Sequence, residues 1–114
     1  MDRLTIIIRQ DLPAGAQLAQ ACHAVAEFGV HHPDGFRAWA TNDRNIVCLA
    51  APDEDALAAL ADAAESLGLA CSRFHEPDLA GSLTALALGD GARQLTSCMP
   101  LALRALAEPV RSVA

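Results

Sequence analysis

The sequence has 114 residues, which is enough for one domain with one hydrophobic core and too little for two. Its 53% apolar and 19% charged residues exclude a disordered chain, and its 4% aromatic residues argue against a stacking surface for single-stranded bases. The net charge of −6 comes from 14 acids against eight arginines, but five acids fall within residues 53–65, so a phosphate-binding face elsewhere is compatible with the composition.

The first half of the chain predicts two strands with a helix between them. Residues 4–9 are a β-branched run typical of a buried strand, and residues 44–50 predict a second strand. A helix from Gly15 to a stop at Pro33 precedes a short helix or turn over residues 34–40. The apolar stripe expected to face the core is formed by Leu18, Ala21, Cys22, Val25, Phe28 and Gly29. The polar flank of this helix is formed by Gln17, Gln20, His23, Glu27 and His31.

The second half predicts a helix, two strands and a last helix. Pro52 suits the first turn of a helix that ends at Gly68. Residues 69–74 and 82–88 predict strands, and residues 90–99 predict a helix. In the last strand we expect alternation, with Leu83, Ala85 and Ala87 on one face and Ser82, Thr84, Leu86 and Leu88 on the other.

The order βαβαββα indicates the α/β class. Each strand–helix–strand unit favours parallel strands, whereas the seven-residue link 75–81 is too short for a crossover, so the fourth strand should run antiparallel to the third. We therefore expect a single three-layer domain over residues 1–114, with a small four-stranded mixed sheet and helices on both faces. The core should span about residues 4–99, with a C-terminal tail over 100–114.

The chain shows no sign of a membrane span or an export signal. No apolar run approaches the about 18 residues that cross a bilayer, and the N-terminus lacks the pattern of a signal peptide. Without export, four cysteines that form no C-x-x-C pair indicate reduced, mostly buried thiols, with Cys22 in the core. We expect a cytoplasmic protein with no membrane partner, and the sequence leaves a homodimer open.

Ligands of open α/β sheets gather at the carboxyl ends of the parallel strands. There Asp11, His75, Glu76 and the N-terminus of the first helix should converge, which is the minimum equipment for water-mediated ester hydrolysis but also common by chance. Ser82 lacks a nucleophile elbow, and His31 and His32 are better interpreted as surface histidines than as metal ligands. We expect no cofactor and no metal.

Residues 9–24 (RQDLPAGAQLAQACHA) resemble the archaeal/eukaryotic-type peptidyl-tRNA hydrolase family, whose signature is a strand, an R-x-D-L turn and G-K-x-x-A-Q-x-x-H-A on the first helix. Residues 51–54 (APDE) and 81–84 (GSLT) are similar to two further motifs of that family. The resemblance covers about residues 4–99 and is closest to the divergent peptidyl-tRNA hydrolase domain-containing branch. It implies the same fold that the element order predicts.

The resemblance implies a hydrolase that cleaves the ester between a peptide, or an N-blocked amino acid, and the 3′ end of tRNA. Peptidyl-tRNA is then the expected partner. The catalytic residues it implies are Asp11, His23 and Glu76, with Asp78 as the alternative to Glu76. The implied substrate contacts are Arg9, Gly15, Gln20, Ser82 and Thr84.

One position departs from the family signature. The family's lysine falls on Ala16, and the chain contains no other lysine, although Arg9 restores a positive charge if its side chain faces the cleft. The alternative function is therefore a catalytically weak or inactive tRNA- or protein-binding module of the same fold. His23 has a structural alternative as a hydrogen-bonded packing residue that orients the first loop.

A tRNA partner also makes a prediction about charge. The acids of residues 53–65 should face away from the cleft of Asp11 and Glu76, because carboxylates repel phosphates. The arginines available to phosphates, several of which we expect on one face, are Arg9, Arg37, Arg44, Arg73 and Arg93.

Overall fold

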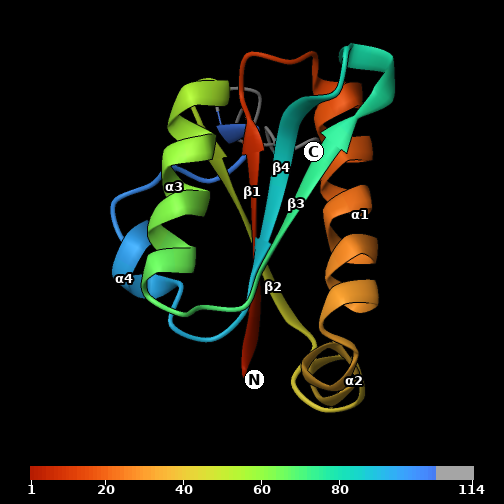
Figure 1. Ribbon diagram of the computed structural model, residues 1–114, viewed down its shortest axis with the longest axis vertical. Coiled ribbons are helices and arrows are strands. Elements are labelled where there is room, and N and C mark those ends of the chain that lie inside the picture. The colour runs from red at the N-terminus through yellow and green to blue at the C-terminus, as the bar shows by residue number, and fades with distance from the viewer. Residues whose placement is uncertain (105–114) are drawn as a thin grey trace, which may run out of the picture.

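Four strands form one mixed sheet in the computed structural model, which describes residues 1–104 (Figure 1). The strands are β1 (Arg3–Arg9), β2 (Asn45–Ala51), β3 (Cys71–Glu76) and β4 (Ser82–Leu88). The helices are α1 (Ala14–His31), α2 (Pro33–Thr41), α3 (Glu54–Ser66) and α4 (Arg93–Thr96), with a 3₁₀ turn, η1 (Pro77–Leu79), between β3 and β4. The predicted α/β class is confirmed, while α4 is one turn long rather than a helix over 90–99.

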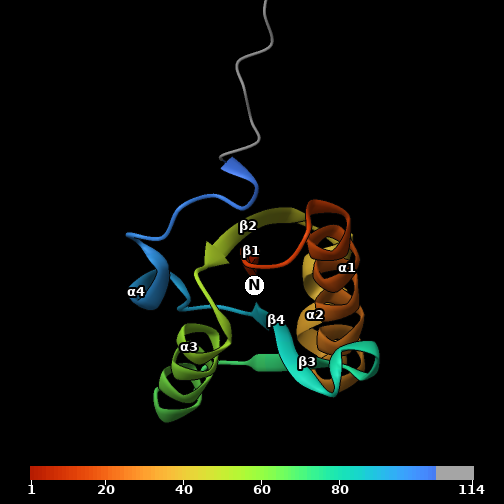
Figure 2. The same cartoon turned by 90° about the horizontal axis from the view of Figure 1, so that it is seen from above.

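The helices cover both faces of the sheet, with α1 and α2 on one side and α3 and α4 on the other (Figure 2). The strand order is β2-β1-β4-β3, so β1 and β2 pair in parallel and β4 runs antiparallel to both β1 and β3. The predicted antiparallel pairing of the last two strands is confirmed. Because β4 lies between β1 and β3, the three parallel-running strands all end at one edge, where the sequence placed the site.

The outer edge of β2 is paired with the chain that follows α4. The Ala50 N–H donates to the Pro100 carbonyl at 3.0 Å, and the Ala102 N–H donates to the Cys48 carbonyl at 2.8 Å. These bonds cover an otherwise open strand edge. The first residues of the predicted tail therefore dock on the sheet, while residues 105–114 lie outside the described residues.

The buried face of α1 agrees with the expected stripe at Phe28, with Ala21 and Val25 packed against the same core, and differs from it at Leu18 and Cys22. Leu18 is 60% exposed and Cys22 is exposed, whereas Gln17 and Gln20 are buried against the sheet beside Ala24 and Phe28. The apolar stripe was assigned from hydrophobicity alone. The two glutamines are buried because polar groups on the sheet and the β1–α1 loop form hydrogen bonds with their amides.

The expected alternation along β4 is confirmed from Ala85 to Leu88 and is wrong at Leu83 and Thr84, because the strand contains a β-bulge. Phe74 pairs with Ala85 and His75 with Leu83, so Thr84 is an extra residue in β4. As a result Leu83 joins Leu86 and Leu88 in the core under α3, while Ala85 lies in the core under α1. The hydroxyl of Thr84 bonds to α1, so that Thr84 and Ala85 face the same helix.

Two element boundaries also move. β3 runs to Glu76 instead of ending at residue 74, and α3 begins after Asp53, whose side chain accepts a hydrogen bond from the Ala56 N–H at 2.9 Å. Pro52 therefore precedes the helix rather than opening it, because Asp53 is the better N-cap.

The thiols are less buried than expected, since Cys22 and Cys98 are exposed and only Cys48 and Cys71 are half-buried. Burial raises the pKa of the Cys71 thiol to about 11, which keeps it protonated and weakly nucleophilic. Among residues 1–104, no helix is both long and apolar enough to cross a membrane.

Leu18→Ala tests the orientation of α1, and Phe28→Ala is the reference for a side chain that is buried in either orientation. Phe28→Ala should lower the free energy of unfolding by about 3–5 kcal/mol, because the ring is fully buried. Leu18→Ala should change it by no more than about 0.5 kcal/mol, because the side chain faces outward. Urea denaturation measures both values, and a loss of several kcal/mol for Leu18→Ala would restore the orientation expected from hydrophobicity.

Candidate active site

A chain of buried hydrogen bonds joins three of the implied site residues on the α1 face. The Thr84 hydroxyl donates to Gln20 Oε1 at 2.6 Å, and Gln20 Nε2 donates to Glu76 Oε1 at 3.2 Å. Thr84 and Gln20 are 0% and 3% exposed, whereas Glu76 is half-buried. A carboxylate oxygen can only accept, so the Gln20 amide N–H must face Glu76, and Gln20 Oε1 is left to accept from the Thr84 hydroxyl. Glu76 is thereby held in one position.

A tight hairpin sets the backbone at Glu76. The chain leaves β3 through η1 and returns through Ala80 and Gly81, which both have positive φ angles of 57° and 73°. The Gly81 N–H donates to the Glu76 carbonyl at 2.9 Å, and Ser82 pairs directly with Glu76 across the strands. Asp78 lies exposed on the turn. Glu76 is therefore the acid of this hairpin that the Gln20 amide contacts.

A second network lies at the same edge and centres on Arg9. Its guanidinium donates to both Asp11 carboxylate oxygens at 2.9 Å, and its remaining nitrogen donates to the Leu83 carbonyl at 3.3 Å. The Leu83 N–H donates to Glu54 Oε2 at 2.6 Å. Pairing of β1 with β4 ends at Ile8 and Ala85, so these two side chains bond the main-chain groups of Leu83 that β1 no longer reaches.

This network fixes the charge states of Arg9 and Asp11. Hydrogen bonding from Arg9 lowers the pKa of Asp11, and the same bond raises the pKa of Arg9, with further support from the charges of Asp11, Glu54 and Asp53. A carboxylate with a lowered pKa and both oxygens engaged is a poor proton acceptor. Asp11 therefore anchors the β1–α1 loop, and the charge of Arg9 is already neutralised by acids.

His23 lies beside the first network without joining it. Its ring stacks on Phe74, with ring centroids 4.4 Å apart and an angle of 11° between the planes. The residue is exposed, and within residues 1–104 its side chain makes no hydrogen bond, so it does not orient the first loop as one interpretation held. Phe74 precedes the end of β3 by two residues, so the stacked pair flanks Glu76.

The N-terminus of α1 opens toward the same edge (Figure 1). Its cap is Pro13, which offers no side-chain hydrogen bond, and its first turn holds no acid. The first N–H groups of a helix lack intrahelical partners and attract negative charge. A Cβ on Gly15 would meet nothing within 4 Å, so there is open space beside this turn.

The acids of residues 53–65 were expected to lie away from the cleft of Asp11 and Glu76, and only some of them do. Asp62 and Glu65 of α3 form ion pairs with Arg73 of β3 at 2.9 and 3.0 Å, away from the carboxyl edge of the sheet. The expectation is wrong for Asp53 and Glu54: Asp53 caps α3 at the site edge, Glu54 bonds to Leu83, and both charges act on Arg9. Glu54 reaches the edge from the α3 side of the sheet, whereas Gln20 bonds to Glu76 on the α1 side.

The five arginines expected to meet phosphates do not gather on one face. Carboxylates hold Arg9 and Arg73, while Arg37, Arg44 and Arg93 form no ion pair within the described part of the chain. Arg37 lies on α2 and Arg44 follows it, and α2 covers the same face of the sheet as α1. Arg93 lies on α4, on the opposite face (Figure 2).

Most of the implied site residues thus fall into two groups. Thr84, Gln20 and Glu76 are joined on the α1 face, and Arg9 and Asp11 are joined beside Leu83. Sequence reasoning missed three contributors, Phe74, Glu54 and Leu83. Leu83 faces α3 because of the bulge, which no local pattern in β4 predicts, while Phe74 and Glu54 act through contacts with residues distant in sequence. In residues 1–104, no three of the His, Cys, Asp and Glu side chains are grouped so that they could hold a metal ion.

One comparison with known protein families gives a match. The family model described as "Peptidyl-tRNA hydrolase PTH2" matches residues 3–100. No curated protein sequence is significantly similar to the chain.

The ion pair of Asp11 predicts a pH dependence of stability. Because the folded pKa is lowered, its contribution is fully present above the pKa of the unfolded chain and is lost as the pH falls through the folded value. The Asp11 side chain is 41% exposed, so Asp11→Asn should cost at most about 1 kcal/mol near neutral pH.

Denaturation of both proteins between about pH 5 and pH 2 should show this difference shrinking toward zero. Asp43→Asn, at an exposed acid without an ion pair among residues 1–104, is the control and should show no such trend. A difference for Asp11→Asn that stays constant down to the lowest pH would contradict the assignment.

Proposed function

The chain belongs to the peptidyl-tRNA hydrolase PTH2 family, and we propose that it hydrolyses the ester between a peptide, or an N-blocked amino acid, and the 3′ end of tRNA. Water adds to the ester carbonyl, the bond to the tRNA oxygen breaks, and that oxygen leaves with a proton. The products are a free peptide carboxylate and tRNA with a free hydroxyl. The observation that carries the proposal is the buried chain from Thr84 through Gln20 to Glu76.

Glu76 is the group proposed to handle the water. Gln20 occupies Oε1, while Oε2 accepts no hydrogen bond from residues 1–104 and can accept one from a water molecule. The half-buried carboxylate then orients the water, takes its proton as the oxygen attacks, and returns a proton to the leaving oxygen. Holding the carboxylate through a buried amide lowers the cost of reaching this arrangement.

The first turn of α1 is proposed to stabilise the oxyanion. Its free N–H groups and its positive dipole end favour the negative charge that develops on the carbonyl oxygen. The open space beside Gly15 supports the approach of a substrate to this turn. Ser82 lies opposite Glu76 and His23 flanks it, so both are positioned to contact the substrate around the ester.

The tRNA is proposed to approach from the α1 side of the sheet. Glu54, Asp62 and Glu65 belong to α3 on the other side, where they would repel phosphates. Arg37 and Arg44 lie at the α2 end of the favourable face and are the arginines proposed to meet the tRNA backbone. A role in translation in the cytoplasm follows from this substrate as a further expectation.

Ala16 supports one alternative, a weakly active or inactive binding module for tRNA or protein. The family resemblance implies a lysine here, and Arg9 does not replace its charge, because Asp11 holds the guanidinium in a two-pronged ion pair. The site therefore lacks a free cation from either residue.

Replacing Glu76 by glutamine should separate the two functions. Glu76→Gln should lower the turnover of N-acetylated aminoacyl-tRNA by at least about a hundredfold, because the amide cannot accept the proton. Asp78→Asn is the matched control, since this acid lies on the exposed turn two residues later, and its turnover should stay near that of the parent. If the parent protein, at a concentration equal to the substrate, cleaves no ester, the binding module becomes the better function.

Restoring a lysine at position 16 should raise activity. A tenfold gain for Ala16→Lys corresponds to about 1.4 kcal/mol of transition-state stabilisation, which one well-placed charge can supply. The lysine opposes the helix dipole at a cost of about 0.3–1 kcal/mol, so the fold should persist. Adding Glu76→Gln should abolish the gain. A folded Ala16→Lys protein with unchanged turnover would show that this position does not limit the reaction.

A further inference from the structure

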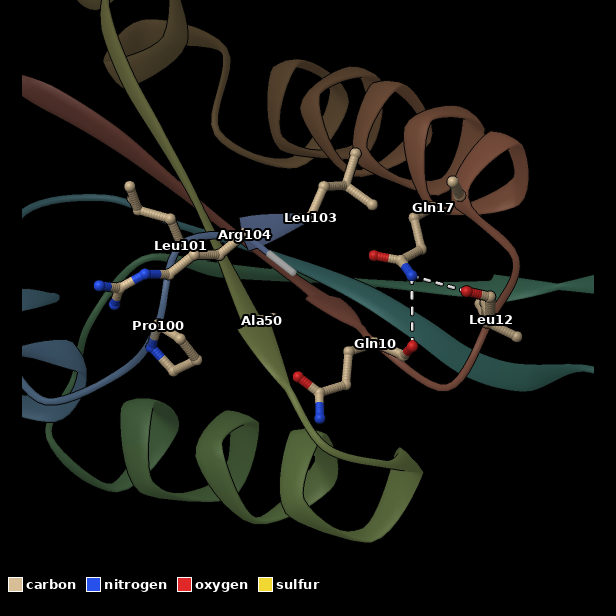
Figure 3. A pocket seen from close by; sticks show the side chains of 9 residues that line it. Gln10, Leu12, Gln17, Ala50, Pro100, Leu101, Leu103 and Arg104 are labelled. Carbon is tan, nitrogen blue, oxygen red and sulfur yellow. Dashed lines mark hydrogen bonds between the residues drawn. The ribbon is translucent and has the colours of Figure 1, made fainter. Parts of the chain in front are cut away.

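A pocket of about 660 Å³ lies beside the N-terminus of α1, between the β1–α1 loop and the segment that docks on β2 (Figure 3). Its walls come from the loop after β1, the first turns of α1, the end of β2 and the segment that docks on β2. The residues lining it are Gln10, Leu12, Ala14, Gln17, Ala50, Pro100, Leu101, Leu103 and Arg104. Most of this lining is aliphatic, and none of it is aromatic or acidic.

Gln17 contributes a fixed and unsatisfied acceptor to this pocket. Its Nε2 donates to the main-chain carbonyls of Leu12 at 2.6 Å and Gln10 at 3.3 Å, and since both partners are acceptors the amide cannot be turned over. Gln17 is only 5% exposed, and its Oε1 has no hydrogen-bond partner among the described residues. Figure 3 shows this oxygen pointing away from Leu12 toward the interior of the pocket.

A buried acceptor without a donor is costly, so the pocket favours an occupant that brings an N–H or O–H group. A phosphodiester or a carboxylate can pair with Arg104 in the lining, but it brings only acceptors and leaves Gln17 Oε1 without a donor. The aliphatic walls favour an apolar group, and without an aromatic side chain they provide no stacking surface for a nucleobase. An amino-acid residue with an aliphatic side chain and its backbone N–H fits both conditions.

We propose that this pocket binds an aliphatic residue of the peptidyl group, with Gln17 Oε1 accepting the backbone N–H of that residue. This assignment rests on the proposed function, because it makes the pocket a subsite for the acyl part of the substrate. Gln17 lines the pocket and Gln20, one turn later on α1, bonds Glu76, so the peptide in the pocket and the attacking water are both next to the first turns of this helix. The pocket then discriminates between substrates by the side chain of the peptidyl group and not by the sequence of the tRNA.

A binding experiment on the full chain tests the pocket without any turnover. Two probes are titrated into isotope-labelled protein and followed by NMR. The first, N-acetyl-leucine dimethylamide, has one N–H, and its N-methylated analogue has none. The first probe should give saturable shifts at Leu12, Ala50, Leu101 and Leu103, and the analogue should bind about fivefold more weakly, the effect of one lost hydrogen bond.

Two variants make this test specific. Gln17→Met keeps the side-chain length but lacks the acceptor, so both probes should bind equally. Ala14→Leu fills the pocket from the first turn of α1 without touching the Gln17 hydrogen bonds and should weaken both probes at least about tenfold. Ala26→Leu is the matched control, because this alanine is exposed on the same helix, and it should bind like the parent.

Turnover of two esters then connects the pocket to the reaction. The kcat/KM for N-acetyl-leucyl-tRNA should exceed that for N-acetylglycyl-tRNA by about tenfold or more, and Ala14→Leu should remove the preference. Probe binding without any ester cleavage would sustain the peptide pocket and reject the hydrolase. Cleavage without probe shifts, equal binding of the two probes to the parent, or shifts at these residues with adenosine instead would reject the peptide pocket.

Discussion

The β-bulge at Thr84 is the constraint on which the site depends. By adding one residue to β4 it turns the Thr84 hydroxyl toward α1, where it meets Gln20 and through it Glu76. On the same strand the pairing with β1 ends at Ala85, and Arg9 and Glu54 bond the main-chain groups of Leu83. The bulge thus builds the first network and lies beside the second, as bulges near functional sites often do.

The two hydrogen-bond networks differ in the number of charged side chains that they contain. On the α3 side, Arg9, Asp11 and Glu54 form a charged cluster that ties β1, β4, the first loop and α3 together. On the α1 side, a neutral amide and a hydroxyl hold a single carboxylate, Glu76. Because Asp11 already pairs with Arg9, that cation would not be available to an ester in the proposed reaction, and this is why the alanine at position 16 matters to the proposal.

Near its N-terminus, α1 contacts the sheet and the β1–α1 loop through glutamine side chains, whereas Leu18 faces outward. Gln20 binds across to β3 and β4, while Gln17, one turn earlier, binds back to the β1–α1 loop. In each glutamine the amide N–H donates to an oxygen that can only accept, and this fixes the orientation of the amide. At Gln20 both ends are satisfied, and at Gln17 the oxygen is left for an occupant of the neighbouring pocket.

The sequence by itself determined the strands, the helix order, the shared edge and the family, because β-branched runs, Gly and Pro stops and the motifs over residues 9–24, 51–54 and 81–84 are local features. It did not determine the bulge in β4, or that Gln17 and Gln20 rather than Leu18 and Cys22 belong to the buried face of α1. Those depend on hydrogen bonds between residues up to 64 positions apart, such as Thr84 to Gln20. A glutamine is polar by composition, and only its tertiary partners decide whether it can be buried.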